Sequence, residues 1–260
     1  MSKDYWAERQ ARIQDAITEK SIKDTERQLT KYYAHAQQEI IGQFEQTYNK
    51  LLTTVEEGYR PTPADLYKLD SYWKMQGQIA KELRDLNFHQ GEIMNLKFIE
   101  QFQHIYEAIG EFDNLHYAEI DTKVVQAMIS EIWCADGLTW NERIWNNTQL
   151  LHKALNDNLI DCVVAGKPAT DLKILLQEQF GVSYRRADTL VRTELSHIQT
   201  QAARQRYTDA GLTQVEVWAS KDERRCDICG KLHEKRYPIG GKMPIPAHPN
   251  CRCCILPVIE

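Results

Sequence analysis

Apolar residues recur with a helical period through most of the chain up to about residue 210. Residues ~3–57 contain no proline and a single glycine, Gly42. Their apolar positions follow an a/d-like seam with spacings of 7, 4 and 7: Tyr33, Ile40, Phe44 and Leu51. Because the sides of this segment are rich in Gln, Glu, Lys and Arg, we expect one long helix or two in tandem. Such a helix is either a member of a bundle or an arm that packs on a partner.

Further helices are predicted after the break at Gly58 to Pro63. Thr62 is expected to be the N-cap of the next helix and Pro63 a residue of its first turn. Its buried face is predicted to contain Leu66, Leu69, Trp73, Ile79, Leu83 and Leu86. The next two helices are expected at about 91–108, ended by Gly110, and at 118–134, with Val124, Val125, Met128, Ile132 and Trp133. A further helix is expected from a Thr139–Glu142 capping box to Gly166. The last two are expected at 171–180 and from Ser183 to about Ala210, ended by Gly211.

The pattern changes after Gly211. Residues 215–219 alternate apolar and polar side chains with β-branched residues, which predicts a strand. Gly240-Gly241 marks a turn, and four further prolines exclude a long helix. We therefore expect a mainly α fold, in which an elongated multi-helix N-terminal body precedes a small α+β C-terminal domain stabilised by zinc. The expected domains are a helical arm at 1–60, a helical bundle at 61–180 and the small domain at 181–260.

Composition and charge limit the class of protein. The 260 residues are 42% hydrophobic and 27% charged, which is ordinary for a soluble globular protein, and no apolar run approaches the length of a membrane span. The polar N-terminus has no apolar region typical of a secretion signal, so we expect a reducing compartment. Residues 181–260 hold 13 Lys and Arg against 9 Asp and Glu, whereas residues 1–180 hold 19 against 28. A basic C-terminal part on an acidic body is compatible with a nucleic-acid or acidic-protein partner.

Five of the seven cysteines lie in the last 35 residues, together with a well-placed histidine, His248. Cys226 and Cys229 form a C-x-x-C pair, and His248 and Cys251 follow about 20 residues later, which is the spacing of a structural zinc site. Five candidates compete for four positions, since Cys253 is an alternative fourth ligand to His248. Cys251 and Cys253 alternate in an extended chain, so both face one ion only if the chain turns. Free thiols and disulfides are the alternatives to zinc.

The remaining candidates are weaker. Cys254, Cys134 and Cys162 are interpreted as buried core residues, and five other histidines have no ligand spacing: His35, His89, His104, His116 and His152. Glu194 and His197 share one face of a helix, where either a metal ligand pair or one buried polar contact is consistent with the spacing. The predicted contacts to DNA or a partner are Arg192, Glu194, Arg224, Arg225, Lys231, Arg236 and Arg252, with a solvated basic surface as the alternative.

Several segments in order resemble the phage head morphogenesis family, also called Mu F-like minor head proteins. These are Leu190 to Glu194, Tyr207 to Gly211, the strand ending at Trp218, Lys221 to Cys229, and Pro244 to Cys253, with Asp136 to Trp145 upstream. The resemblance covers about residues 135–260, whereas the N-terminal helices match only in general character. Cys254 departs from the family, which usually has Thr or a similar residue there.

The resemblance implies a minor virion component of a tailed bacteriophage, made in the host cytoplasm and located inside the capsid near the portal vertex. The implied partners are the portal protein, the major capsid or scaffold protein, and double-stranded DNA during packaging or ejection. The competing hypothesis is a zinc-dependent nuclease or another DNA-processing enzyme carried in the head. Catalysis would need a base and an open coordination position. His233 with Glu234, or Glu194 with His197, form no nuclease signature, so we expect no enzyme activity.

Overall fold

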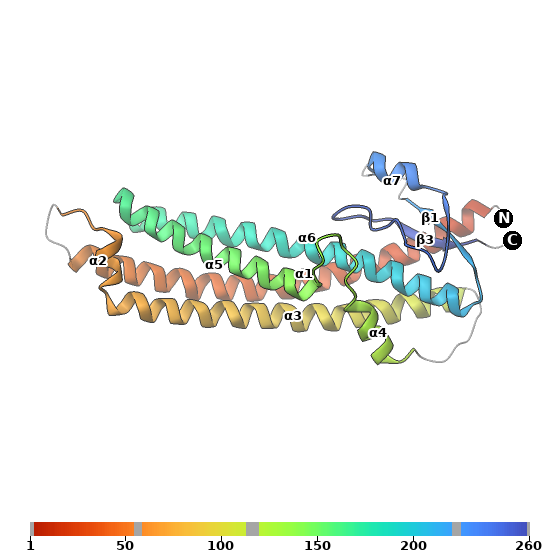
Figure 1. Cartoon of the computed structure of the whole chain (residues 1–260), viewed down its shortest axis with the longest axis horizontal. Coiled ribbons are helices and arrows are strands. Elements are labelled where there is room, and N and C mark those ends of the chain that lie inside the picture. Colours follow the sequence, from red (N-terminus) through yellow and green to blue (C-terminus); the bar gives the residue numbers. More distant parts are fainter. Residues whose placement is uncertain (1–2, 55–58, 113–119, 220–224, 259–260) are drawn as a thin grey trace. The chain divides into compact units, whose positions relative to one another are not determined.

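The computed structural model describes residues 3–54, 59–112, 120–219 and 225–258. The prediction of a mainly α fold with a small C-terminal sheet is confirmed (Figure 1). The helices are α1 (Lys3–Thr54), α2 (Pro63–Tyr67), α3 (Asp70–Phe112), α4 (Thr122–Ile129), α5 (Trp140–Ala165), α6 (Ala169–Asp209) and α7 (Asp227–Leu232). The strands are β1 (Gln214–Trp218), β2 (Arg236–Pro238) and β3 (Cys254–Pro257). None of the helices in the described residues has the length and apolar character needed to cross a membrane.

Helix α1 is a single helix, as the first of the two sequence alternatives predicted. Two later predictions of separate helices were wrong, because α3 continues through Gly91 and α6 continues through Gly181. A glycine inside a helix costs only about 1 kcal/mol, whereas the buried side chains on both sides of each glycine stabilise the continuous helix by more. Gly110 does not end α3 either. A Cβ at this position would lie 2.7 Å from Cζ of Arg206, so the glycine allows a close approach of that side chain.

The predicted inward position of Trp73 was wrong. The capping box of α2 forms between Thr62 and Asp65 as the N-cap prediction required, but this helix ends at Tyr67 and α3 begins only at Asp70. The interruption shifts the helical phase, so Tyr72 is buried while Trp73 is 61% exposed. The indole N–H of Trp73 donates to the carbonyl oxygen of Tyr67 at 3.0 Å. The predicted helix at 118–134 is also shorter, since α4 spans Thr122–Ile129 and leaves Val124 and Ile132 exposed.

Helices α5 and α6 end as predicted, at glycines with left-handed backbone. Gly166 has φ +62° and Gly211 has φ +76°. The amide of the residue after each glycine donates to a carbonyl oxygen in the last turn of the helix. Lys167 N–H donates to Cys162 O, and Leu212 N–H donates to Tyr207 O, both at 3.0 Å. This is the Schellman arrangement, which satisfies carbonyl groups that a helix end leaves without partners.

The chain forms two compact units that each draw on separate stretches of sequence. The first unit contains Met1–Glu26, Met94–Trp140 and Thr189–Glu260, and the second contains Arg27–Ile93 and Asn141–Asp188. The second unit is a helical bundle with a large apolar core that includes Phe44, Tyr48, Ile79, Leu155, Leu159, Leu176 and Phe180. The division at 1–60, 61–180 and 181–260 stays a prediction.

In the first unit, the beginning of α1 packs on the C-terminal sheet. This antiparallel sheet has the order β2-β1-β3. Trp218, Cys254 and Leu256 form a buried apolar cluster against Ala7 and Ala11 of α1. The later part of α1 contributes Tyr33, Ile40, Phe44 and Leu51 to the core of the helical bundle, so α1 is a bundle member, which is one of the two roles expected for it.

The interface between α1 and the rest of the first unit also contains buried polar side chains. Gln10 donates to the Tyr207 hydroxyl at 2.9 Å, and Gln14 donates to the Ile255 carbonyl oxygen at 3.3 Å. Thr18 donates to Gln199 Oε1 at 2.7 Å, and Thr18 in turn accepts from Gln101 at 2.6 Å. Buried polar groups need such partners, so this interface specifies one position of α1.

Two glycines provide a matched test of these helix ends. No atom lies within 4 Å of a Cβ added at either Gly42 or Gly211, but only Gly211 has a positive φ. We expect Gly211→Ala to lower the free energy of unfolding by about 1–2 kcal/mol because of the left-handed backbone. Gly42→Ala should raise it by about 0.5–1 kcal/mol, since alanine is the better helix former. Urea denaturation measures both, and a stabilised Gly211→Ala protein would contradict the assignment of this helix end.

Candidate metal centre

Helix α7 positions the C-x-x-C pair. Cys226 is the N-cap residue of this helix, with φ −79° and ψ 163°, and its sulfur accepts a hydrogen bond from the Cys229 amide at 3.4 Å. The extended N-cap followed by one helical turn brings the two thiols to the same side. The Cys229 amide lowers the pKa of Cys226, because it stabilises the thiolate. Metals bind the thiolate form.

A tight turn brings His248 and Cys251 together. The Cys251 amide donates to the His248 carbonyl oxygen at 3.2 Å, which closes a four-residue turn. Pro249 occupies its second position, and Asn250 occupies the third position with φ +60°. Proline followed by a residue with positive φ defines a type II turn, and Asn is one of the few residues that tolerate this conformation. His-Pro-Asn-Cys is therefore a sequence suited to place its first and last side chains side by side.

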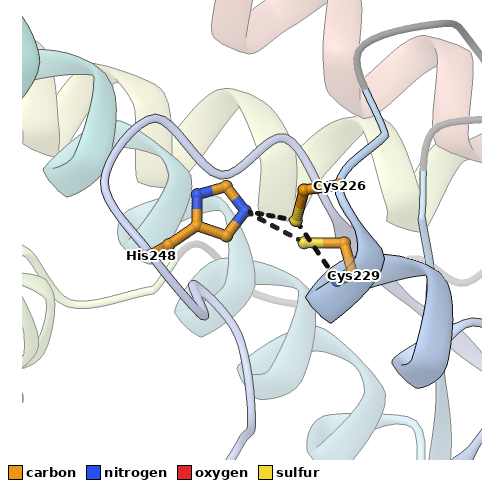
Figure 2. A group of neighbouring side chains, drawn as sticks. All are labelled: Cys226, Cys229 and His248. Carbon is orange, nitrogen blue, oxygen red and sulfur yellow. Dashed lines mark hydrogen bonds between the residues drawn. The ribbon is translucent and has the colours of Figure 1, made fainter.

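The predicted ligands gather in two overlapping groups. Cys226, Cys229 and His248 form one group, and Cys229, Cys251 and Cys253 form the other; within each group the donor atoms lie within 4.8 Å of one another. Figure 2 shows His248 directed at both sulfurs of α7, with Nε2 3.2 Å from Cys226 Sγ and 3.1 Å from Cys229 Sγ. The sulfurs of Cys229 and Cys251 are 3.8 Å apart. Donors from two stretches of the C-terminal segment, 226–229 and 248–253, thus meet at Cys229.

These donors fit a tetrahedral zinc ion. Zn–S bonds of about 2.3 Å place two sulfurs about 3.8 Å apart in a tetrahedron, which agrees with the distance between Cys229 and Cys251. Nδ1 of His248 lies 2.8 Å from the Pro249 carbonyl oxygen, to which it donates. In the neutral ring the proton is then on Nδ1, and the Nε2 lone pair faces the sulfurs. A backbone carbonyl that orients a histidine in this way is the usual outer partner of a zinc ligand.

The electrostatics of the thiol group also favour a cation. A hydrogen bond from the Cys253 thiol lowers the pKa of Cys251 to about 5, and the same bond raises the pKa of Cys253 far above its usual range. Burial raises the pKa of Cys229 to about 12. Cys229 and Cys253 thus keep their protons beside the Cys251 thiolate, since further negative charges so close together would repel one another. A divalent ion that displaces these protons would offset the repulsion.

The geometry bears on the choice of the fourth ligand. The expected difficulty of directing both Cys251 and Cys253 at one ion does not hold, because both belong to one donor group with Cys229. His248 faces Cys226 and Cys229 together, whereas Cys251 and Cys253 both belong only to the group without Cys226. The set Cys226, Cys229, His248 and Cys251 stays a prediction, with Cys253 as the alternative fourth ligand.

The cysteines outside the two donor groups differ in burial. Cys254 lies in the apolar cluster with Trp218, and burial raises its pKa to about 12, as expected of a core thiol. Cys162 is buried, but Cys134 is only half-buried, so its interpretation as a core residue was wrong. Burial lowers the pKa of His152. His116 lies outside the described residues.

Three side chains predicted as partner contacts are bonded within the first unit. Arg192 forms an ion pair with Glu26, and Arg252 lies 4.0 Å from Asp15. Glu194 is 2% exposed and accepts a hydrogen bond from the Trp133 indole at 2.9 Å. Arg225, Lys231 and Arg236 are exposed, and Arg224 lies outside the described residues.

The two histidines considered for catalysis also make local contacts. The His197 ring is stacked on Trp133, with ring centroids 4.2 Å apart and an interplanar angle of 8°. Only 5% of its surface is exposed, so it offers little access to a DNA strand. His233 Nδ1 accepts a hydrogen bond from the Ala219 amide at 3.3 Å and packs against the edge of Trp218.

Two residues near the centre were not predicted from the sequence. Thr193 Oγ1 accepts a hydrogen bond from the Asn250 amide at 3.1 Å, which joins α6 to the His248–Cys251 turn. Trp133 joins the segment before α5 to both Glu194 and His197. Thr193 was recognisable as the middle residue of Arg-Thr-Glu, but its contact spans 57 residues of sequence, and no local pattern carries that information.

Comparison with known families gives a match to the family model described as Phage Mu protein F like protein, over residues 153–256. This segment is Mu F-like. It runs from α5 through β3 and includes the whole Arg192–Glu194 sequence and all five candidate metal ligands. The resemblance expected from about residue 135 is thus found from residue 153. Comparisons with curated proteins and with solved structures give no match.

We expect the purified protein to contain one zinc ion per chain, and Cys226→Ser to lose it. Serine keeps the size of the side chain but removes the thiolate that Zn²⁺ prefers. Cys134→Ser is the control, because this cysteine belongs to neither donor group. Elemental analysis after dialysis measures the metal, and thiol titration measures free cysteines. A metal-free wild-type protein with all seven thiols reactive would contradict the centre.

The same measurement distinguishes the two candidate fourth ligands. If His248 completes the tetrahedron, His248→Ala should lower zinc affinity strongly, while Cys253→Ser should bind nearly as tightly as the wild type. Cobalt substitution provides a second readout, because the absorption spectrum depends on the number of thiolate ligands. A spectrum typical of four thiolate ligands would show that Cys253, and not His248, is the fourth ligand.

Proposed function

We propose that this chain is a minor head protein of a tailed phage, which binds the portal or the inner capsid during head morphogenesis. The observation that carries the proposal is the Mu F-like match over residues 153–256. The proposed role is structural, and the zinc ion would stabilise the fold of the C-terminal segment. Proposed partners are the portal protein and the major capsid or scaffold protein.

The two units suit different parts of this role. The second unit is a helical bundle with no candidate metal group among its described residues, and its helices present exposed polar faces to a protein partner. The first unit contains the candidate zinc centre and the exposed basic residues around α7 and β2. We assign the contact with the portal to the helices and a second contact to the zinc-binding segment.

We expect the protein to be present in purified heads and to bind the portal protein of the same phage. Immunoblots of heads isolated from an infected culture test the first expectation, and size-exclusion chromatography of a mixture with purified portal tests the second. A chain absent from the heads would contradict the proposal. Presence in heads without portal binding would leave the inner capsid as its position.

A contact with packaged DNA is the finer part of the proposal. Arg225, Lys231 and Arg236 are exposed, whereas Arg192 and Arg252 are paired with acidic residues of the chain. Charge attraction to phosphates is the sequence-independent mode of binding that a head protein needs for a whole genome. These three residues would form the DNA-binding surface together with the neighbouring Lys235.

Titration with a DNA duplex tests this surface. Three phosphate contacts predict an affinity loss on the order of 40-fold between 50 and 200 mM salt, because each contact releases counterions. Replacing Arg225, Lys231 and Arg236 by alanine should abolish the binding. The control replaces Lys50, Lys74 and Lys153, which are equally exposed residues of the second unit. No binding at low salt, or equal losses in both variants, would contradict the contact.

A further inference from the structure

Three consecutive residues of α6 contact three different segments of the first unit. Arg192 pairs with Glu26 of α1, Thr193 accepts a hydrogen bond from Asn250, and Glu194 accepts one from Trp133. Successive residues of a helix point about 100° apart, so neighbouring side chains reach different surroundings. The Arg-Thr-Glu sequence therefore joins α1, the His248–Cys251 turn and the segment before α5 at one place on α6.

The Thr193 hydroxyl is set up as a hydrogen-bond acceptor. It donates its own proton to the Thr189 carbonyl oxygen at 2.7 Å, one helical turn earlier. A threonine that makes this bond within its helix has a fixed hydroxyl orientation, and its lone pairs are directed outward. The Asn250 amide occupies one of them at 3.1 Å.

The Asn250 amide belongs to the residue that sets the shape of the turn. Asn250 has φ +60°, a conformation that costs free energy in a residue other than glycine and persists where surrounding contacts hold it. His248 and Cys251 are the first and last residues of the same turn. A bond from Asn250 to a rigid helix therefore restrains the positions of two candidate ligands at once.

Glu194 and Arg192 hold the helix on either side of Thr193. The buried Glu194 carboxylate accepts from Trp133, whose ring stacks on His197 one turn further along α6. Arg192 and Glu26 are both partly buried, which screens their ion pair less than a surface pair. These contacts account for the identity of the charged residues in Arg-Thr-Glu without a role in catalysis or DNA binding.

We propose that Thr193 is a positioning residue of the metal centre, whose hydroxyl holds the His248–Cys251 turn against α6 in the geometry that binds the ion. The proposal rests on the zinc centre proposed above. Thr193 belongs to neither donor group and acts only through the turn. It is thus a hydrogen-bonding partner outside the ligand set, a kind of residue whose loss typically weakens metal binding by 10–100-fold.

The test compares Thr193→Val, which is close in shape but lacks the hydroxyl, with Thr193→Ser, which keeps it. The control is Thr208→Val, the same change at an exposed threonine of α6 whose hydroxyl bonds only the preceding turn among the contacts described. Competition with a chromophoric chelator measures zinc affinity in the full-length protein. We expect Thr193→Val to bind zinc about 10–100-fold more weakly, while Thr193→Ser and Thr208→Val stay close to the wild type.

Equal affinities of Thr193→Val and the wild type would overturn the proposal, as would an equal loss in Thr208→Val. Hydrogen exchange of the wild-type protein provides an independent measurement that does not depend on a variant that folds. The Asn250 amide should exchange slowly although its residue is exposed, and rapid exchange would also overturn the proposal. A wild-type protein that binds no zinc refutes the centre itself, a result distinct from unchanged affinity in Thr193→Val.

Discussion

The hydrogen-bonded interface between the beginning of α1 and the C-terminal part of the chain is the interaction on which the first unit depends. Gln10 and Gln14 are almost completely buried, and their partners, Tyr207 and Ile255, lie 197 and 241 residues later in the sequence. A buried amide without a partner costs about 1–3 kcal/mol, so α1 adopts this position only when α6 and β3 are in place. The two ends of the chain are therefore expected to fold together.

The same interface explains how so short a C-terminal segment obtains a core. Three short strands bury little apolar surface alone, and a domain of this size usually needs a metal or a disulfide. Here α1 supplies Ala7 and Ala11, whose small side chains allow the sheet to approach the helix closely, and Trp218 and Leu256 fill the interface. This packing on α1 is a source of stability for the sheet that does not depend on the candidate metal centre.

The positions of the candidate ligands depend on the sheet and on α6. Cys253 directly precedes β3, which pairs with β1, and the His248–Cys251 turn is bonded to Thr193 of α6. Donor atoms from the start of α7 converge with those of the turn and the entrance to β3, which lie about 20 residues later in the sequence.

Local sequence determined the features that depend on a few neighbouring residues. Thr62 and Pro63 start α2, Gly166 and Gly211 end helices because they tolerate positive φ, and the alternation at 215–219 forms β1. The spacing of Cys226, Cys229, His248 and Cys251 predicted a set of donors, since ligand chemistry is a property of the side chains themselves, and the structure brings these residues together in two overlapping groups.

Only the tertiary structure decided the features that depend on distant contacts. Helix α3 continues through Gly91 and α6 continues through Gly181, because the packing of the side chains before and after each glycine stabilises the continuous helix. Each glycine costs about 1 kcal/mol, which is too little to break a packed helix, although the local sequence suggested a break. The restart of α3 at Asp70 turns Trp73 outward, and the partners of Gln14 and Thr193 lie on segments far along the chain. Sequence periodicity shows which residues favour burial, but the partner of each residue is chosen by the free energy of the whole fold.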